Sequence, residues 1–552
     1  MHRSLLEYLN AFYRCGREVA YAERRGYRMV RWCYREVAET ASQFARELEA
    51  RGIGRGDRVL LWGANSAEWV AAFWGCLLRG AVAVPMDRIA TADFALGVAR
   101  QANARLLVCS RDHANHDLAL PIITLEDLPQ RVAQRARERY PCPDAQRSDL
   151  AQIVFTSGTT AEPKGVLISH GNVLANLEPL EVEIQKHLKY ERIFHPLRFL
   201  NLLPLSHIFG QFLGIFVPPL LGATVVFQDS MNPSEVMRTI KRERMSVLAT
   251  VPRVLETLRG KLERDLEAEG RLVWLRQEIQ AAEGEAFARR MWRFRGIHRR
   301  FGWKFWAFIS GGAALPAQTE AFWSCLGFAV VQGYGLTETA SLVSVNHPFR
   351  PAKGSIGKAL PGREIKLDTN GEILVRGESI TAGYSQGEGG QGVEGSAGEG
   401  GWFRTGDIAE LDAEGNLYFK GRKKSVIVTP AGMNVYPEDL EVALRREPGV
   451  RDCIVIGLER DGNAEACAVL LLSDASSDPA AIVQRANARL AEYQRMRRWF
   501  VWPEQDFPRT PTQKPRTTVI AEVVEAQLAA PREARADHSK LAELIAGLIR
   551  RG

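Results

Sequence analysis

The sequence lacks the cysteine patterns of disulfide-stapled and zinc-binding proteins. Its eight cysteines are scattered over 552 residues, at positions 15, 33, 76, 109, 142, 325, 453 and 467, with no CxxC pair and no histidine cluster beside them. Disulfide frameworks and structural zinc sites need such spacings. We therefore expect free thiols in a reducing compartment.

A secretion signal and a stretch suited to crossing a bilayer are also missing. The first twenty residues, MHRSLLEYLNAFYRCGREVA, contain no continuous apolar core and no small-residue cleavage site. Residues 199–228 carry no formally charged side chain, but they include Asn201, Pro204 and the pair Pro218-Pro219. These residues would leave backbone groups unsatisfied in lipid. We predict buried helix and strand here and a cytoplasmic protein.

No charge of one sign dominates. The 72 Lys and Arg residues face 65 Asp and Glu residues, and the net charge of +7 is only a weak bias towards anionic partners such as nucleotides, coenzymes or phospholipid surfaces. With 46% hydrophobic and 25% charged residues, the composition is that of a globular protein. The length excludes a small binding module and predicts two or three domains.

Helical and strand patterns alternate along the chain. Apolar residues at helical spacing over 34–48 are followed by an apolar run at 58–62, a second helical pattern over 68–78 and a run at 81–84. The same rhythm returns at 223–227, 247–251, 307–309 and 329–331. This alternation predicts an α/β fold with a mostly parallel sheet.

Two segments break this rhythm. Residues 254–305 are helical and charged, and the part from 289 to 304 is strongly basic, with interleaved Trp292, Phe294, Phe301 and Trp303. A solvated helical hairpin explains this segment, and attachment to an anionic membrane surface is the alternative. Residues 385–401 consist largely of Gly, Ser and Glu, which predicts a mobile surface loop.

The end of the chain forms a separate unit. Short strands at 372–375 and 417–419 predict a β-meander, and new strand and helix signals begin near residue 425. We place the boundary after residue 422, which gives a large N-terminal domain, 1–422, and a small C-terminal domain, 423–552.

Residues 153–165, IVFTSGTTAEPKG, form the most informative motif. An apolar strand leads into a loop of small hydroxyl residues and glycines that ends at Lys164. Such a loop offers backbone N–H groups, hydroxyl donors and one cation to a polyphosphate. It is not a Walker A loop, because Lys164 lies between Pro163 and Gly165. A Ser/Thr/Gly turn without function is the alternative.

Further glycine-rich motifs follow predicted strands. SGGAA at 310–314 and VQGYGLTET at 331–339 would let a ligand approach the backbone, and Glu338 could hold a magnesium ion. RTGD at 404–407, GRKK at 421–424 and PRTPTQK at 508–514 come later, and the last of these places Lys514 in a stiff, proline-rich loop. Each motif alone is also compatible with a structural turn.

In this order, the motifs between residues 34 and 514 resemble the adenylate-forming superfamily of acyl-CoA synthetases, luciferases and peptide-synthetase adenylation domains. Residues 201–210, NLLPLSHIFG, and 301–312, FGWKFWAFISGG, look most like the long-chain fatty acyl-CoA ligases. The resemblance implies that 1–422 is an ATP- and acyl-binding domain of mostly parallel sheets covered by helices. It implies that 423–552 is a mobile α+β lid.

The resemblance also implies an activity, that of a long-chain fatty acid–CoA ligase. Such an acid–thiol ligase uses ATP and Mg²⁺ to turn a fatty acid into an acyl-adenylate and then transfers the acyl group to CoA, releasing AMP and pyrophosphate. Two rival functions remain: an acyl-AMP ligase that delivers the acyl group to an acyl carrier protein, and a non-catalytic nucleotide-binding protein. We expect no nucleic-acid partner and, as an alternative to a purely cytoplasmic location, peripheral contact with the inner face of the membrane.

The resemblance assigns a role to each matching residue. The loop over the ATP phosphates is formed by Thr156, Ser157, Gly158, Thr159, Thr160 and Lys164. The adenine site is lined by Gly311, Gly312, Ala313, Gln332, Gly333 and Tyr334, with Phe419 near the base and Asp407 and Arg422 at the ribose. The catalytic residues are Lys514, Thr337 at the α-phosphate, Glu338 as the magnesium ligand and His207 beside the acyl carboxyl, and Lys424 is the hinge.

Three departures from the family pattern accompany these matches. Ala161 stands where the phosphate loop usually has glycine, and the segment 385–401 replaces what is normally helical. Gln513 replaces the usual glycine before the catalytic lysine and Pro515 follows that lysine. Both residues predict a stiffer loop around Lys514. None of these changes removes a side chain with a chemical role.

Overall fold

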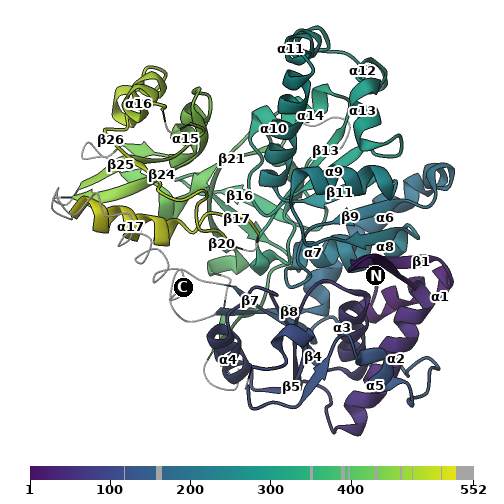
Figure 1. Cartoon of the computed structure of the whole chain (residues 1–552). Helices are drawn as coiled ribbons and strands as arrows, with labels where there is room; N and C mark the ends of the chain where they lie inside the picture. Colours follow the sequence, from purple (N-terminus) through teal and green to yellow (C-terminus); the bar gives the residue numbers. More distant parts are fainter. Residues whose placement is uncertain are drawn as a thin grey trace. The chain divides into compact units, whose positions relative to one another are not determined.

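The computed structural model describes residues 1–116, 118–156, 164–347, 352–386, 392–395, 398–428, 433–460, 463–474, 476–510 and 512–529 (Figure 1). The chain divides into two compact units. The first comprises residues 1–365, 375–403 and 414–416, and the second comprises 366–374, 404–413 and the chain from 417 onward.

Two large sheets build the first unit, as far as the structure describes it. The order of the nine-stranded sheet is β15 (Lys358–Ala359), β14 (Ser344–Val345), β13 (Ala329–Tyr334), β12 (Ala307–Ser310), β11 (Val247–Thr250), β9 (Arg198–Asn201), β10 (Thr224–Phe227), β1 (Val19–Arg25), β2 (Arg28–Cys33). Its central strands, from β13 to β1, run parallel. The strands expected at 223–227, 247–251, 307–309 and 329–331 are confirmed.

The order of the second, eight-stranded sheet among the described residues is β19 (Gly392–Gly395), β18 (Gly383–Gln386), β8 (Lys164–Ser169), β7 (Leu150–Thr156), β4 (Val82–Met86), β3 (Arg58–Trp62), β5 (Ala104–Cys109), β6 (Ile122–Thr124). Its strands β3 to β7 are parallel neighbours, whereas β8, β18 and β19 pair antiparallel. The α/β fold with mostly parallel sheets is therefore confirmed. The loop expected over 385–401 is corrected in part, because β18 and β19 form a hairpin there.

Helices cover both sheets of the first unit: α1 (Leu9–Cys15), α2 (Tyr34–Ala50), α3 (Ala67–Arg79), α4 (Ala92–Gln101), α5 (Leu128–Val132), α6 (His170–Phe194), α7 (Ile208–Gln211), α8 (Val217–Leu220), α9 (Pro233–Arg242), α10 (Pro252–Ala268), α11 (Leu272–Ala281), α12 (Phe287–Arg293), α13 (Arg295–Phe301) and α14 (Ala317–Cys325). Helix α3 begins at Ser66, whose side chain accepts the N–H of Trp69, and ends at the left-handed Gly80. It crosses α2 closely at Gly75, where a β-carbon would lie 2.6 Å from the Phe44 ring.

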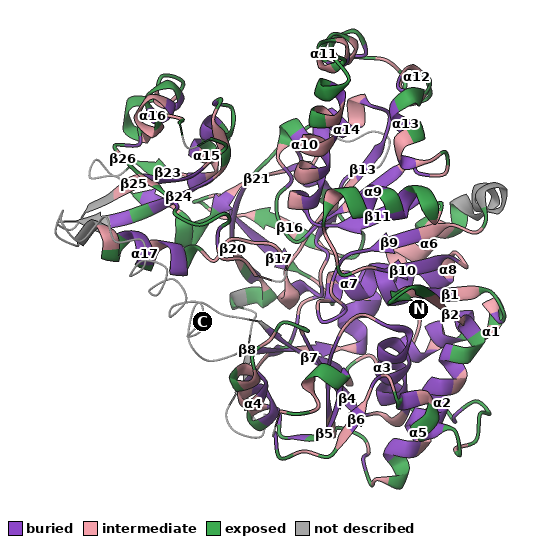
Figure 2. Ribbon diagram, viewed as in Figure 1, coloured by how far each residue is buried: buried purple, intermediate pink, exposed green. Residues whose placement is uncertain are grey.

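The uncharged stretch 199–228 lies inside the core (Figure 2). Phe199, Leu205, Phe212 and Phe216 are each at most 3% exposed and pack in the main hydrophobic cluster of the first unit. The prediction of buried helix and strand here is confirmed. No helix among the described residues is both long and apolar enough to cross a membrane.

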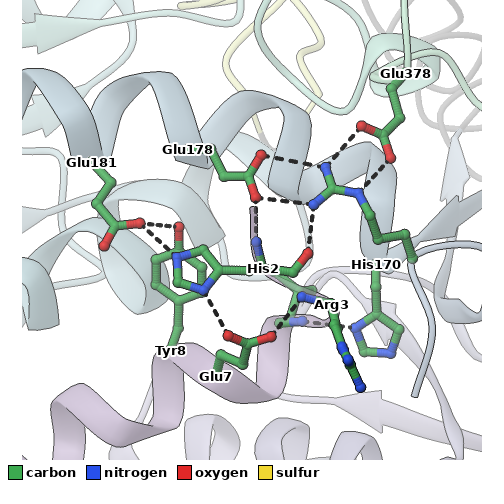
Figure 3. Close-up of polar contacts among 10 residues, drawn as sticks. His2, Arg3, Glu7, Tyr8, His170, Glu178, Glu181 and Glu378 are labelled. Carbon is green, nitrogen blue, oxygen red and sulfur yellow. Dashed lines mark hydrogen bonds and ion pairs between the residues drawn. The ribbon is translucent and has the colours of Figure 1, made fainter. Parts of the chain in front are cut away.

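The N-terminus is tied to helix α6 by a polar cluster (Figure 3). The His2 ring lies 2.9 Å from Glu7 and 3.0 Å from Glu181, and the Tyr8 hydroxyl donates to Glu181 over 2.6 Å. Arg147 donates to the His2 carbonyl over 2.6 Å. The first residues of the chain are thus part of the folded unit.

The second unit is an α+β structure. A three-stranded sheet, β24 (Val450–Arg460), β25 (Asn463–Leu472) and β26 (Arg498–Val501), packs with α15 (Pro437–Arg445), α16 (Pro479–Asn487) and α17 (Thr517–Ala529). A two-stranded ribbon consists of β22 (Ile427–Val428) and β23 (Asn434–Val435). The order of the four-stranded meander is β16 (Glu364–Leu367), β17 (Glu372–Arg376), β20 (Phe403–Leu411), β21 (Leu417–Arg422), and the division between the units passes through it.

Candidate functional site

Two of the predicted glycine-rich motifs meet at one edge of the nine-stranded sheet. Strands β12 and β13 are parallel, with Ser310 opposite Gln332, so residues 311–313 and 332–334 emerge side by side at their carboxyl ends. The Phe209 ring packs against Gly311, where a β-carbon would lie 2.6 Å from the ring. Ligands of α/β sheets bind at this kind of edge. The structure therefore brings the six expected adenine-site residues together.

The turns after β12 and β13 both need glycine. Gly312, after β12, has a φ of +83°, and a β-carbon on Gly335, after β13, would lie 2.1 Å from the Ser341 carbonyl oxygen. The chain then forms the short 3₁₀ helix Thr337–Thr339, which ends at the left-handed Ala340. Thr337 and Glu338 are half-buried at the start of this turn.

Glu338 is held by a tyrosine from the other sheet. The Tyr384 hydroxyl donates to Oε1 of Glu338 over 2.9 Å, and the N–H of Thr381 donates to the Glu338 carbonyl over 2.8 Å. The amine of Lys164 lies 5.9 Å from the centre of the Tyr384 ring. Tyr384 thus connects two predicted site residues, Lys164 and Glu338, that are 174 positions apart in the sequence.

The Glu338 carboxylate fits the magnesium ion that the resemblance implies. Tyr384 engages Oε1, and Oε2 accepts no hydrogen bond from any described residue. Among those residues no three His, Cys, Asp or Glu side chains gather into a metal site. Magnesium is commonly bound by one or two carboxylates together with substrate phosphates and water. A single carboxylate such as that of Glu338 is sufficient for that mode.

The phosphate-loop motif lies at a β-hairpin. Strands β7 and β8 pair antiparallel, with Thr156 opposite Lys164, and Lys164 is exposed at the start of β8. The predicted loop residues Ser157, Gly158, Thr159 and Thr160 lie outside the described residues, as does Ala161. The strand expected before the loop is confirmed.

His207 follows β9 at the same edge of the nine-stranded sheet. Its Nε2 lies 3.7 Å from Oδ2 of Asp87, the residue directly after β4, and the Ser206 hydroxyl donates to the same oxygen over 3.3 Å. His207 is half-buried and precedes helix α7. The two sheets of the first unit therefore meet at His207.

A cavity of about 430 Å³ lies beyond the end of β10. Its walls include Met29, Val226 and Phe227, but most of its lining is polar or charged, as at Arg24 and Arg238. This cavity does not provide an apolar tunnel for a fatty-acid tail.

In the second unit, Asp407 and Arg422 form an ion pair across two strands. They lie opposite each other on β20 and β21, with the Arg422 Nε 3.2 Å from Oδ1 of Asp407. Asp407 is buried at 2% exposure, and Phe419 is half-buried on β21. Glu372 supports this turn, because its carboxylate accepts the N–H of Gly406 over 3.1 Å.

The loop that carries Lys514 is a tight turn. The N–H of Thr510 donates to the Lys514 carbonyl over 2.8 Å, and the N–H of Gln513 donates to Thr510 over 2.8 Å. The Arg509 guanidinium donates to the Gln513 carbonyl over 3.1 Å. Gln513 has a φ of +62°, the left-handed region that glycine adopts most easily.

Lys514 is electrostatically perturbed. The pKa of its amine is lowered to about 8, chiefly by burial and also by the nearby Arg422 guanidinium, while the Asp407 carboxylate opposes both effects. The second unit therefore brings Lys514, Asp407 and Arg422 together. Lys424, two residues after Arg422, is exposed in the short 3₁₀ helix Lys423–Ser425.

Residues 11–385 match the family model for AMP-binding enzymes. That match covers more than half of the chain and includes the phosphate loop, the adenine edge and Glu338. The chain belongs to the AMP-binding enzyme family. This is the adenylate-forming superfamily that its motifs resemble.

Full-length relatives of this AMP-binding enzyme support the assignment. A long-chain-fatty-acid–CoA ligase, FadD15, from Mycobacterium bovis is 27% identical over 89% of this chain and 91% of its own. FadD13 from Mycobacterium tuberculosis, also named a long-chain-fatty-acid–CoA ligase, is 28% identical over 89% of this chain and 93% of its own. The solved o-succinylbenzoate CoA synthetase of Bacillus subtilis, with its acyl-adenylate, has a TM-score of 0.72 at 24% identity over 95% and 98% of the chains and shares the fold.

Sequence reasoning missed three residues of this AMP-binding enzyme that support predicted ones. Tyr384 supports Glu338, Asp87 faces His207, and Glu372 holds the turn before Asp407. Asp87 lies three residues after the predicted run at 81–84, which was a usable signal. Tyr384 and Glu372 carry no signal of this kind, since their partners come from distant strands.

Proposed function

We propose that this AMP-binding enzyme activates a fatty acid with ATP and transfers it to CoA. The observation that supports this most directly is Lys514, which lies with Asp407 and Arg422. An amine that accompanies the predicted ribose residues is suited to reach the α-phosphate of the same nucleotide. The non-catalytic rival gives no reason for such a perturbed lysine.

In the proposed first step, a carboxylate oxygen attacks the α-phosphorus of ATP and pyrophosphate leaves. The step brings an anion towards a polyanion, so cations must offset the repulsion. Lys164 would bind the phosphates, Thr337 the α-phosphate, and Lys514 the reacting carboxylate and α-phosphate. Magnesium bound at Glu338 would neutralise phosphate charge. Preorganised charges of this kind are worth about 3 to 4 kcal/mol each.

In the proposed second step, the CoA thiolate attacks the acyl carbon and AMP leaves, while the thiol proton passes to solvent. The thiol needs the space that pyrophosphate and Lys514 occupied in the first step. We propose that residues 423–552 act as a lid that turns about Lys424 between the two steps. The exposure of Lys424 in a single 3₁₀ turn is compatible with that role.

A fatty acid is the substrate class that the names of FadD15 and FadD13 favour. The o-succinylbenzoate synthetase shows that the same fold also serves another acid. Each methylene transferred from water into an apolar site contributes about 0.8 kcal/mol. We therefore expect the specificity constant to rise with chain length from acetate towards medium and long chains.

The deciding experiment measures pyrophosphate release over a panel of carboxylic acids, with and without CoA. Release with medium- and long-chain acids, and formation of acyl-CoA, would support the proposal. A peak at acetate or at an aromatic acid would contradict the fatty-acid assignment. Adenylate formation followed by transfer only to an acyl carrier protein would favour the acyl-AMP ligase. No release with any acid would favour the non-catalytic protein.

A further inference from the structure

Helices α12 and α13 and the turn after them expose basic and aromatic residues to solvent. The exposed residues are Arg289 and Trp292 on α12, Arg295 and Arg299 on α13, and Trp303 directly after Gly302, at which α13 ends. Trp292 is 70% exposed and Trp303 is 73% exposed. We refer to these five residues as the α12–α13 face.

The opposite side of the same helices is already packed. Phe294, Ile297, Phe301 and Phe305 are at most 2% exposed and belong to the second hydrophobic cluster of the first unit. The Phe301 ring lies 5.7 Å from the ring of Trp323 on α14. The two exposed indoles are therefore not needed to hold the helices on the core.

Among the residues that the structure describes, acidic side chains pair with Arg293 and Arg300 but not with the arginines of the α12–α13 face. Arg293 lies 2.6 Å from Glu278 and 2.6 Å from Glu285, and Arg300 lies 2.5 Å from Glu269. Within the described part of the chain, no ion pair is formed by Arg289, Arg295, Arg299 or Lys304. The outward charge of this segment is positive.

A cationic side chain lies close to the ring of each exposed indole. The Arg295 guanidinium lies 4.4 Å from the Trp292 ring centre, and the Lys304 amine lies 5.4 Å from that of Trp303. Tryptophan prefers the interface between membrane and water, and basic residues are attracted to anionic headgroups. In each pair the indole suits the membrane–water interface and the cation suits the anionic headgroups.

We propose that the α12–α13 face binds the surface of an anionic phospholipid bilayer. Basic and aromatic residues also bind single-stranded nucleic acid, but usually in a groove that follows the backbone. Both indoles are strongly exposed, at 70% for Trp292 and 73% for Trp303, which favours the bilayer. The proposal does not depend on which acid the enzyme activates.

The test compares sedimentation of the full chain with vesicles of phosphatidylcholine alone and of phosphatidylcholine with 30% phosphatidylglycerol. One variant, Arg289→Glu/Arg295→Glu/Arg299→Glu, reverses the charge of the face, and another, Trp292→Ala/Trp303→Ala, removes the indoles. The matched control, Arg100→Glu/Arg131→Glu/Arg137→Glu, makes the same charge change at three exposed arginines on other parts of the surface. Circular dichroism and pyrophosphate release check that each variant is folded.

We expect the unmodified protein to bind the anionic vesicles and to lose binding as salt rises. Charge reversal should weaken binding by about a hundredfold or more, since each basic residue near the surface contributes about fivefold. Removal of the indoles should weaken it about tenfold, and the control should stay within about threefold of the unmodified protein. Equal binding to both vesicles, no binding at low salt, or equal weakening by the control would overturn the proposal. Displacement from vesicles by single-stranded RNA that binds more tightly would assign the face to nucleic acid instead.

Discussion

The pKa of Lys514, about 8, predicts a pH dependence for adenylation alone. If the protonated amine stabilises the transition state, the rate follows the fraction of ammonium. That fraction is about 90% at pH 7, half at pH 8 and about 10% at pH 9 for a pKa of 8. The rate of adenylate formation, measured as pyrophosphate release, should therefore fall about tenfold between pH 7 and pH 9.

Substitution of Lys514 can remove its charge or make that charge independent of pH. Lys514→Ala should reduce adenylation by two to three orders of magnitude, which corresponds to about 3 to 4 kcal/mol of transition-state stabilisation. Lys514→Arg keeps a charge at every pH in this range, because a guanidinium does not titrate there. This variant should be slower than the unmodified enzyme at pH 7 but should lose the fall between pH 7 and pH 9.

The second half-reaction is the internal control. Thioester formation from synthetic acyl-adenylate and CoA should be nearly unchanged in Lys514→Ala, because the proposed lid motion would remove the lysine from the site before this step. Lys420→Ala is the matched lysine variant, because Lys420 lies on the same unit in a surface ion pair 3.0 Å from Glu410. It should keep both half-reactions. Equal damage to both steps by Lys514→Ala, or normal adenylation without the amine, would refute the assigned role.

Three further predictions concern other parts of the molecule. Glu338→Gln should lower adenylation about a hundredfold and raise the Mg²⁺ concentration needed for half-maximal rate, and an unchanged Mg²⁺ titration would contradict the metal role. Gln513→Val should destabilise the second unit to urea by about 1 to 2 kcal/mol, because a β-branched residue fits the left-handed region poorly, whereas Gln513→Gly should not destabilise it by this route. Burial lowers the pKa of His170 to about 4 in the folded protein, so that as the pH falls this imidazole takes up a proton in the unfolded chain before it does in the folded one. Stability should then fall by up to about 3 kcal/mol as pH drops from 6.5 to 4, and a urea series on His170→Asn should show a flatter pH slope.

The regular elements of the large unit were predictable from local pattern. The run at 58–62 is strand β3 and the helical pattern over 34–48 lies in α2, because buried parallel strands and amphipathic helices leave a direct periodic signature. The adenine edge was predictable for the same reason. Once β12 and β13 are known to be parallel neighbours, the glycines that follow them must meet.

The hairpin of β18 and β19 was not predictable in this way. Its strands, GYSQ and GVEG, are too short and too rich in Gly and polar residues to read as typical strands, with Val393 the one β-branched residue in them. The pairing of Tyr384 with Val166 on β8 makes β18 part of the sheet. Tertiary pairing therefore overrides local propensity, and it also places the Tyr384 hydroxyl beside Glu338.

The loop of Lys514 shows why a departure from a family motif is weak evidence against function. Gln513 adopts the left-handed conformation that glycine would adopt, at a cost of roughly 1 to 2 kcal/mol. That cost is comparable to what a few hydrogen bonds contribute, at about 1 kcal/mol each. Thr510 bonds to both Gln513 and Lys514, and Arg509 binds the Gln513 carbonyl. These contacts offset the strain and hold the lysine backbone in place. The side chain that the chemistry requires is unaffected, so the substitution alters the rigidity of the loop and not its charge.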